Sequence, residues 1–262
     1  MRHLILEGRV AIVTGSSAGI GFAIAQTLAK AGASVVINGR TLDKLDEAED
    51  SIEANGGKIL AIQADASETE GIEKIVTETK NYFGHIDILV NNAATVGVGQ
   101  SVEEMPIEVW DDVMSTNLRA VFLMCKAVIP HLKERDGGRI INIGGLSGKN
   151  PLAFAAADAC AKAGLMALTR VLAAELGYFQ TTVNTVIPGF QPDTEIGQQF
   201  NEKLAGAFMI SPEESIAVTR AKTLLKRFET LDELAGTVLF LCSDASEFVT
   251  GTNFVLDDGQ TL

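Results

Sequence analysis

The stretch Thr14-Gly15-Ser16-Ser17-Ala18-Gly19-Ile20-Gly21 directly follows four apolar residues, Val10–Val13, and precedes a helical pattern. A short apolar run rich in β-branched residues is typical of a buried strand. Glycines at this junction permit a tight turn and let backbone amides approach a pyrophosphate at a helix N-terminus, where the helix dipole favours negative charge. The spacing Gly-x-x-x-Gly-x-Gly differs from the standard dinucleotide fingerprint. By itself the stretch is compatible with a phosphate-binding loop or with an ordinary strand–helix turn.

Short apolar runs alternate with long helical patterns along the whole chain. Most of the runs lack polar alternation, as do strands that are buried on both faces of a parallel sheet. The chain is therefore predicted to form one α/β domain over residues 1–262, with a Rossmann-like doubly wound sheet of seven parallel strands. Ligands are then expected at the carboxyl edge of the strands. The predicted strands are Val10–Val13, Val35–Ile37, Ile59–Ile62, Ile86–Val90, Arg139–Ile143, Thr182–Ile187 and Phe254–Leu256.

Helix boundaries and one irregular segment complete this organisation. Three residue pairs have the spacing of a capping box, in which Ser or Thr begins a helix and Glu follows three positions later. Gly32 and Gly56 are expected to end helices. Residues 190–227 fit the alternation poorly and are predicted to form a small substrate lid over the carboxyl edge. The capping pairs are Ser67 with Glu70, Ser211 with Glu214, and Thr230 with Glu233.

Composition and charge argue against several classes of protein. Hydrophobic residues make up 47% of the chain and charged residues 21%, which is typical of a globular protein. The net charge of −13 repels phosphate backbones and anionic membranes, so neither nucleic acid nor membrane is an expected partner. No apolar run approaches the roughly 20 residues of a membrane span. The three cysteines have no metal-ligand spacing, so a cytoplasmic protein without a metal is expected.

Further motifs follow the glycine-rich stretch in a fixed order. They are Asp65, Asn91-Asn92-Ala93-Ala94, Asn117, Lys162, Pro188-Gly189, and Gly251 with Asp257-Asp258-Gly259. In this order and register the motifs resemble those of the short-chain dehydrogenase/reductase family over residues 8–262. The resemblance implies an NAD(P)-dependent oxidoreductase that acts on a small carbonyl or alcohol substrate.

The resemblance also implies a set of cofactor-binding residues. Family members that prefer NAD usually have an acidic residue at the end of the second strand, whereas this chain has Asn38-Gly39-Arg40. A guanidinium can hold a 2′-phosphate bidentately, so Arg40 predicts NADP(H) over NAD(H) unless it is simply a solvated turn residue. The resemblance places Gly15, Ser17 and Ile20 at the phosphates, Asp65 at the adenine, Asn92 and Ala93 at the adenosine ribose and nicotinamide side, and Lys162 at the nicotinamide ribose. Gly19, Gly21, Ala66, Pro188 and Gly189 complete the implied cofactor-binding residues.

Two of the four catalytic groups that the family uses are missing. Asn117 and Lys162 are present, but the family's tyrosine position holds Asp158 and its serine position holds Gly145. Ser147 lies two residues beyond the expected serine and can replace it only if the loop is remodelled. The atypical catalytic set is therefore Asn117, Ser147, Asp158 and Lys162.

Asp158 leaves three functional interpretations open. It precedes Lys162 by four residues on one predicted helix, so the two side chains can face the same cleft and pair. A carboxylate beside an ammonium is a poor proton donor but can act as a base. The protein is then an NADP(H)-dependent oxidoreductase with a modified site, a non-redox enzyme that enolises, dehydrates or isomerises with Asp158 as base, or a cofactor-binding pseudoenzyme.

Two helical patterns contain more apolar and small residues than one face of a sheet can bury. They cover residues 109–133 and 158–176. Family members commonly pair these helices across a two-fold axis, so a homodimer or homotetramer is expected.

Overall fold

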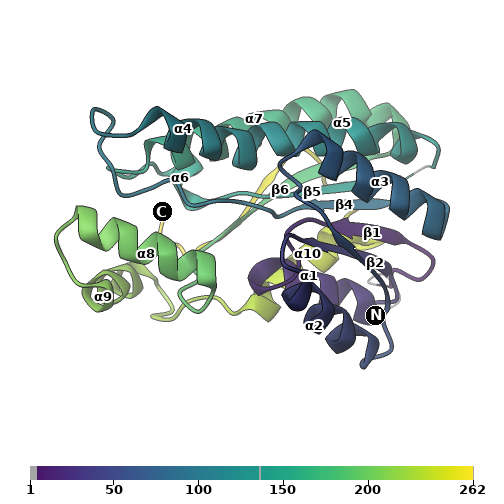
Figure 1. Cartoon of the computed structure of the whole chain (residues 1–262), viewed down its shortest axis with the longest axis horizontal. Coiled ribbons are helices and arrows are strands. Elements are labelled where there is room, and N and C mark those ends of the chain that lie inside the picture. Colours follow the sequence, from purple (N-terminus) through teal and green to yellow (C-terminus); the bar gives the residue numbers. More distant parts are fainter. Residues whose placement is uncertain (1–4, 136, 262) are drawn as a thin grey trace.

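The computed structural model describes residues 5–135 and 137–261, and these form a parallel sheet covered by helices on both faces (Figure 1). The seven strands lie in the order β3-β2-β1-β4-β5-β6-β7. The order reverses between β1 and β4, and ligands of open α/β sheets bind beside such a reversal. The predicted fold is thus confirmed. The strands are β1 (Val10–Val13), β2 (Ser34–Gly39), β3 (Lys58–Gln63), β4 (Ile88–Asn91), β5 (Arg139–Ile143), β6 (Thr182–Pro188) and β7 (Asn253–Leu256).

The helices form two layers because each presents one apolar face to the sheet. One apolar cluster joins α1, α2 and α10 to the sheet, and a second joins α3, α5 and α7 to the opposite face (Figure 1). The helices are α1 (Gly19–Lys30), α2 (Leu42–Glu53), α3 (Thr69–Phe83), α4 (Ile107–Met114), α5 (Ala120–Lys133), α6 (Leu146–Lys149), α7 (Ala156–Leu176), α8 (Glu195–Ala207), α9 (Pro212–Lys222) and α10 (Leu231–Cys242).

Two of the three predicted capping boxes are confirmed. Ser211 caps α9 and Thr230 caps α10, each with the reciprocal glutamate contact. The Ser67 prediction is wrong, because α3 begins only after Glu68 and no side chain caps it. The Ser67 hydroxyl instead donates to the Asp65 carboxylate at 2.6 Å. The Ser67 hydroxyl is hydrogen-bonded to the Asp65 carboxylate and does not cap the helix.

The helical run Ile107–Lys133 joins α4 to α5 through a π-helical segment, Ser115–Arg119. Its length and mean hydropathy of 1.2 reach the values of a membrane-spanning helix, although the sequence contains no uninterrupted apolar run of that length. In the fold, α5 contributes buried residues to the apolar cluster on one face of the sheet, and α4 and the π-helical segment contact α7. Burial against neighbouring elements accounts for part of the apolar composition of this run, one 18-residue stretch of which is 39% buried.

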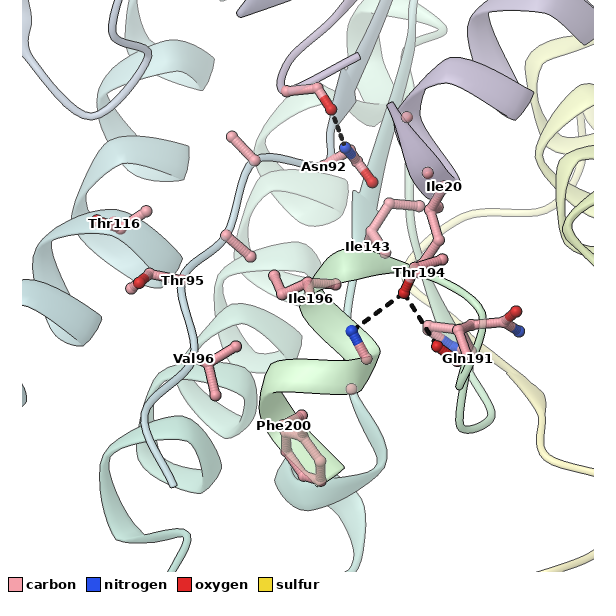
Figure 2. Close-up of a pocket in the computed structure, with 18 of the residues that line it drawn as sticks. Ile20, Asn92, Thr95, Val96, Thr116, Ile143, Gln191, Thr194, Ile196 and Phe200 are labelled. Carbon is pink, nitrogen blue, oxygen red and sulfur yellow. Dashed lines mark hydrogen bonds between the residues drawn. The ribbon is translucent and has the colours of Figure 1, made fainter. Parts of the chain in front are cut away.

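The segment predicted as a lid contains α8 and α9, which lie away from the two helical layers (Figure 1). Thr194 begins α8: its hydroxyl accepts from the Gly197 amide at 3.1 Å and donates to the Gln191 carbonyl at 3.0 Å (Figure 2). Phe200 and Leu204 of α8 pack on Val96 beyond β4. The segment therefore covers the carboxyl edge of the sheet, and its opening and closing as a lid stays a prediction.

Candidate active site

A cavity of about 890 Å³ lies along the carboxyl edge of the sheet, at the reversal of strand order. The turn after β1, the ends of β2, β4, β5 and β6, and the helix α8 all contribute residues to its lining. Every cofactor-binding residue predicted from the sequence lies in this lining. Ser147, Asp158 and Lys162 lie in it as well. The cavity brings together side chains that are more than 140 residues apart in the chain.

The turn after β1 is shaped to receive an anionic group. Gly15 and Gly19 have φ values of +61° and +57°, a left-handed conformation that favours glycine. A Cβ at Gly21 would collide with the Gly15 carbonyl oxygen. The helix α1 that follows has neither a capping side chain nor an acidic residue in its first turn. Its N-terminal amides and helix dipole are thus available to a phosphate, and the residues fit a nicotinamide dinucleotide.

Asn92 holds this turn in place. Its side-chain amide donates to the carbonyl oxygens of Thr14 and Gly15, both at 2.9 Å; Figure 2 shows one of these two bonds. The Thr14 hydroxyl in turn accepts from the backbone amides of Asn92 and Ala93 at 3.0 and 3.1 Å. The Asn92 side chain therefore shapes the phosphate-binding turn through the protein backbone.

A polar group of residues lies at the end of the cavity formed by β2. The Arg40 guanidinium, 80% exposed, lies 3.7 Å from the Asp65 carboxylate. Burial raises the pKa of Asp65, but hydrogen bonds from Ser67 and the charge of Arg40 outweigh it, so the pKa is lowered overall. A Cβ at Gly39 would lie 2.9 Å from the Ser17 hydroxyl oxygen, so an acidic residue fits there only if Ser17 moves.

Lys162 lies at the other end of the cavity. Its ammonium is buried and donates to the carbonyl oxygen of Ile143, at the end of β5, at 3.1 Å. Burial lowers the pKa of this ammonium, and the charge of Asp158 partly opposes the change. Lys162 and Asp158 face the same cavity, as predicted, but their hydrogen bonds go to other partners, the Ile143 carbonyl and the Ser147 hydroxyl.

Ser147 and Asp158 form a buried hydrogen-bonded pair. The Ser147 hydroxyl donates to Oδ2 of Asp158 at 2.5 Å, and both residues are less than 10% exposed. The short helix α6 places Ser147 there by lying directly on α7. A Cβ at Gly148 would be 2.6 Å from the Lys162 carbonyl carbon, so only glycine permits this approach. Ser147 thus lies in the cavity lining next to Asp158, and its role as a replacement for the family's serine stays a prediction.

Asn117 contacts the Asp158 carboxylate on the oxygen that Ser147 does not use. It lies in the π-helical segment, a distortion often found at functional sites. Its side chain accepts from the Thr95 amide at 2.8 Å and donates to the Thr95 carbonyl at 2.9 Å, with a longer contact of 3.4 Å to Oδ1 of Asp158. Asn117 is not part of the cavity lining. Its side chain contacts the site through Asp158 and Thr95.

The chain matches known proteins along nearly its whole length. The family described as enoyl-(acyl carrier protein) reductase matches residues 15–261. D-beta-hydroxybutyrate dehydrogenase of Rhizobium meliloti (strain 1021) is 35% identical over 256 residues, covering 97% of this chain and 98% of its own. The chain belongs to the short-chain dehydrogenase/reductase family. The predicted family membership is thereby confirmed.

Solved structures of this family place the chain among oxidoreductases. A variant of actinorhodin polyketide ketoreductase with NADPH is 31% identical with a TM-score of 0.91, covering 96% of this chain and 97% of its own. NAD⁺-bound xylitol dehydrogenase is 27% identical with a TM-score of 0.92, covering 96% and 98%. As a short-chain dehydrogenase/reductase, the protein is an NAD(P)-dependent oxidoreductase.

This dehydrogenase/reductase has cavity residues that its sequence did not reveal. The apolar side chains of Ile196 and Phe200 on α8 line the cavity beside Val96, on which Phe200 packs (Figure 2). Their four-residue spacing on one helix face was the available signal. Lys44, Leu152 and the C-terminal residues Gln260 and Thr261 also line the cavity, and no local motif distinguishes them.

Proposed function

We propose that the protein is an NADP(H)-dependent oxidoreductase that interconverts a small alcohol and its carbonyl compound, with Ser147 and Asp158 carrying the proton. The observation that supports this most is the 2.5 Å hydrogen bond from the Ser147 hydroxyl to the Asp158 carboxylate. A hydroxyl whose proton is held by a carboxylate has its oxygen free to accept another proton. It can therefore replace the hydroxyl that the family supplies from tyrosine.

In the oxidative direction the substrate alcohol gives its proton to Oγ of Ser147, while the proton of Ser147 passes to Oδ2 of Asp158. A nicotinamide held beside Lys162 would supply the acceptor for the hydride that leaves the substrate carbon. Asn117 holds Oδ1 of Asp158 and thereby keeps Oδ2 directed at Ser147. Lys162 supplies positive charge at the same end of the cavity and binds the nicotinamide ribose, as its position in the family motif implies.

The preference for NADP(H) is supported by the charge at the β2 end of the cavity. Arg40 and Lys44 are cations of this lining, each beside a carboxylate (Asp65 at 3.7 Å and Glu195 at 2.8 Å), and the Ser17 hydroxyl lies next to Gly39. Position 39, where a carboxylate would repel a 2′-phosphate, holds glycine. A Cβ there would lie 2.9 Å from the Ser17 hydroxyl oxygen, so an acidic side chain does not fit without a shift of Ser17. A charge-assisted contact of Arg40 with that phosphate contributes about 1.5–3 kcal/mol, which corresponds to roughly 10- to 100-fold in affinity.

The test of cofactor preference compares the dissociation constants of NADPH and NADH. Arg40→Ala should weaken NADPH binding roughly 10-fold or more and leave NADH binding within about twofold. Arg170→Ala is the matched control, because Arg170 is exposed and lies outside the cavity lining. Equal affinities for the two nucleotides in the unmodified protein would refute the preference, and no turnover on a broad panel of alcohols and carbonyls would refute the redox function.

Self-association in the cytoplasm is part of the same proposal. Phe122 of α5 is 49% exposed, and it lines a shallow apolar depression together with Met114 and Leu118. Covering this depression by a second copy would remove exposed apolar surface from water. A homodimer or homotetramer is therefore expected, with a small molecule as substrate.

A further inference from the structure

The loop that follows β6 is anchored by a residue almost 40 positions further along the chain. Oε1 of Glu229 accepts hydrogen bonds from the Gly189 amide at 2.9 Å and from the Gln191 side-chain amide at 2.7 Å. Gly189 and Gln191 line the cavity, whereas Glu229 does not. Glu229 therefore reaches the site only through this loop.

Aromatic contacts bind the same two segments together. The ring of Phe190 meets the ring of Phe228 edge to face at 5.4 Å between centroids. Phe190 also lies 6.5 Å from Phe200 of α8, in a tilted arrangement. The residue pair Phe228–Glu229 thus holds the loop by one apolar and two polar contacts, immediately before the N-cap of α10.

The anchored loop lies at the Lys162 end of the cavity. It continues from β6, which pairs with β5 up to Ile143, and the Ile143 carbonyl accepts from Lys162. The glycine-rich turn and Arg40 follow β1 and β2, on the other side of β4 and β5 in the sheet. Residues 189–191 therefore begin the segment at the Lys162 end of the cavity, whereas Thr194, three residues further on, already lies beside Gly19 of the glycine-rich turn.

The carboxyl group of Glu229 is largely buried, and only one of its two oxygens is hydrogen-bonded within the part of the chain that the structure describes. Its Oε2 is buried and has no hydrogen-bond partner among the described residues. Burial raises the pKa of Glu229 to about 7, against the opposing effect of the hydrogen bonds from Gln191 and Gly189. The nearby charged groups are Asp257 after β7 and Glu233 on α10, which raise the pKa further, and Glu233 is itself paired with Arg227. Burying a carboxyl group with one unpartnered oxygen costs free energy of folding, which indicates that Glu229 has a function other than stabilising the fold.

We propose that Glu229 is a positioning residue, which holds the loop 189–191 in the conformation that binds the nicotinamide half of the dinucleotide. This inference rests on the proposed function, because it takes the Lys162 end of the cavity as the nicotinamide end. It differs from a general stabilising role in one measurable respect. Loss of the anchor should weaken the binding of the nicotinamide half and leave the binding of the adenosine half unchanged.

The experiment measures dissociation constants for NADPH and for 2′-phospho-ADP-ribose, which is the same nucleotide without its nicotinamide. Removing two hydrogen bonds in Glu229→Ala should weaken NADPH binding about 10-fold and change 2′-phospho-ADP-ribose binding less than twofold. Glu229→Gln retains a side-chain oxygen as acceptor and should restore most of the NADPH affinity. Glu233→Gln is the matched control and should leave the ratio of the two constants unchanged.

Other variants and outcomes keep the proposal open to refutation. If Glu229→Ala does not fold, Glu229→Asp retains the charge but is one methylene shorter, and it should show a smaller loss confined to NADPH. Equal weakening of both nucleotides, or no change in either, would overturn the role of Glu229. Wild-type protein that binds NADPH but oxidises and reduces nothing would refute the proposed redox function, while the binding ratio would still decide the role of Glu229.

Discussion

Replacing Asp158 by asparagine tests the proton relay while changing the shape of the site very little. The side-chain amide oxygen would face Asn117, because the Asn117 amide donates there, and the new NH₂ group would face Ser147. Ser147 would then accept a hydrogen bond from residue 158 and could no longer pass a proton to it. Relay through Ser147 should therefore stop, although all three side chains remain hydrogen-bonded.

The expected magnitudes separate chemistry from stability. A hydrogen bond to a charged group contributes about 1.5–3 kcal/mol and a neutral one about 0.5–1.5 kcal/mol, so the free energy of unfolding should change by less than about 2 kcal/mol. Loss of positioned proton transfer typically lowers the rate roughly 10²- to 10⁴-fold. The turnover number of Asp158→Asn should fall by that factor, with unchanged affinity for NADPH.

The assay follows reduced nicotinamide by absorbance, with secondary alcohols and NADP⁺ in one direction and carbonyl compounds and NADPH in the other. Thermal unfolding of each variant is measured in parallel. Cys160→Ala is the control, because Cys160 lies on the same helix and is exposed. An Asp158→Asn protein that folds, binds NADPH and keeps more than a third of the wild-type rate would refute the relay.

Three further outcomes are expected from other parts of the molecule. Gly145→Ser with Asp158→Tyr should abolish the native reaction, because it removes the carboxylate that receives the Ser147 proton; a folded double variant that binds NADPH and keeps or gains ketone reduction would contradict the relay. The pKa of Glu229 is raised from 4.5 to about 7, so the folded state keeps a proton that the unfolded chain releases. The wild type should lose stability relative to Glu229→Gln as pH rises from about 4.5 to 7, with a constant difference above that, as urea unfolding would show. Sedimentation at micromolar concentration should give a dimer or tetramer, and Phe122→Asp should shift it toward monomer.

Local sequence features predicted the scaffold and the cofactor side of the site. Apolar runs without polar alternation identified the strands, because strands buried on both faces of a parallel sheet cannot alternate. The glycines at 15, 19 and 21 were recognisable because their backbone conformation and close contacts exclude other residues. The capping box at Ser211 was equally local, since both of its partners lie within one helical turn. The runs and the capping box depend on residues that are neighbours in the chain, and the glycine spacing is itself local, although the close contacts of Gly15 and Gly21 include Ala93 and Asn92.

The catalytic contacts required the tertiary structure. Sequence spacing favoured a pair between Asp158 and Lys162, yet Asp158 accepts from Ser147, because Gly148 lets α6 lie directly on α7. Glu229 carried no motif, since its hydrogen-bond donors at Gly189 and Gln191 are almost 40 positions away. Spacing along one helix indicates which side chains are close enough to form a contact. Packing between helices and loops decides which of these contacts form. The sequence by itself therefore determined the sheet, the glycine-rich turn and the family, whereas only the tertiary structure decided the partners of Asp158 and Glu229.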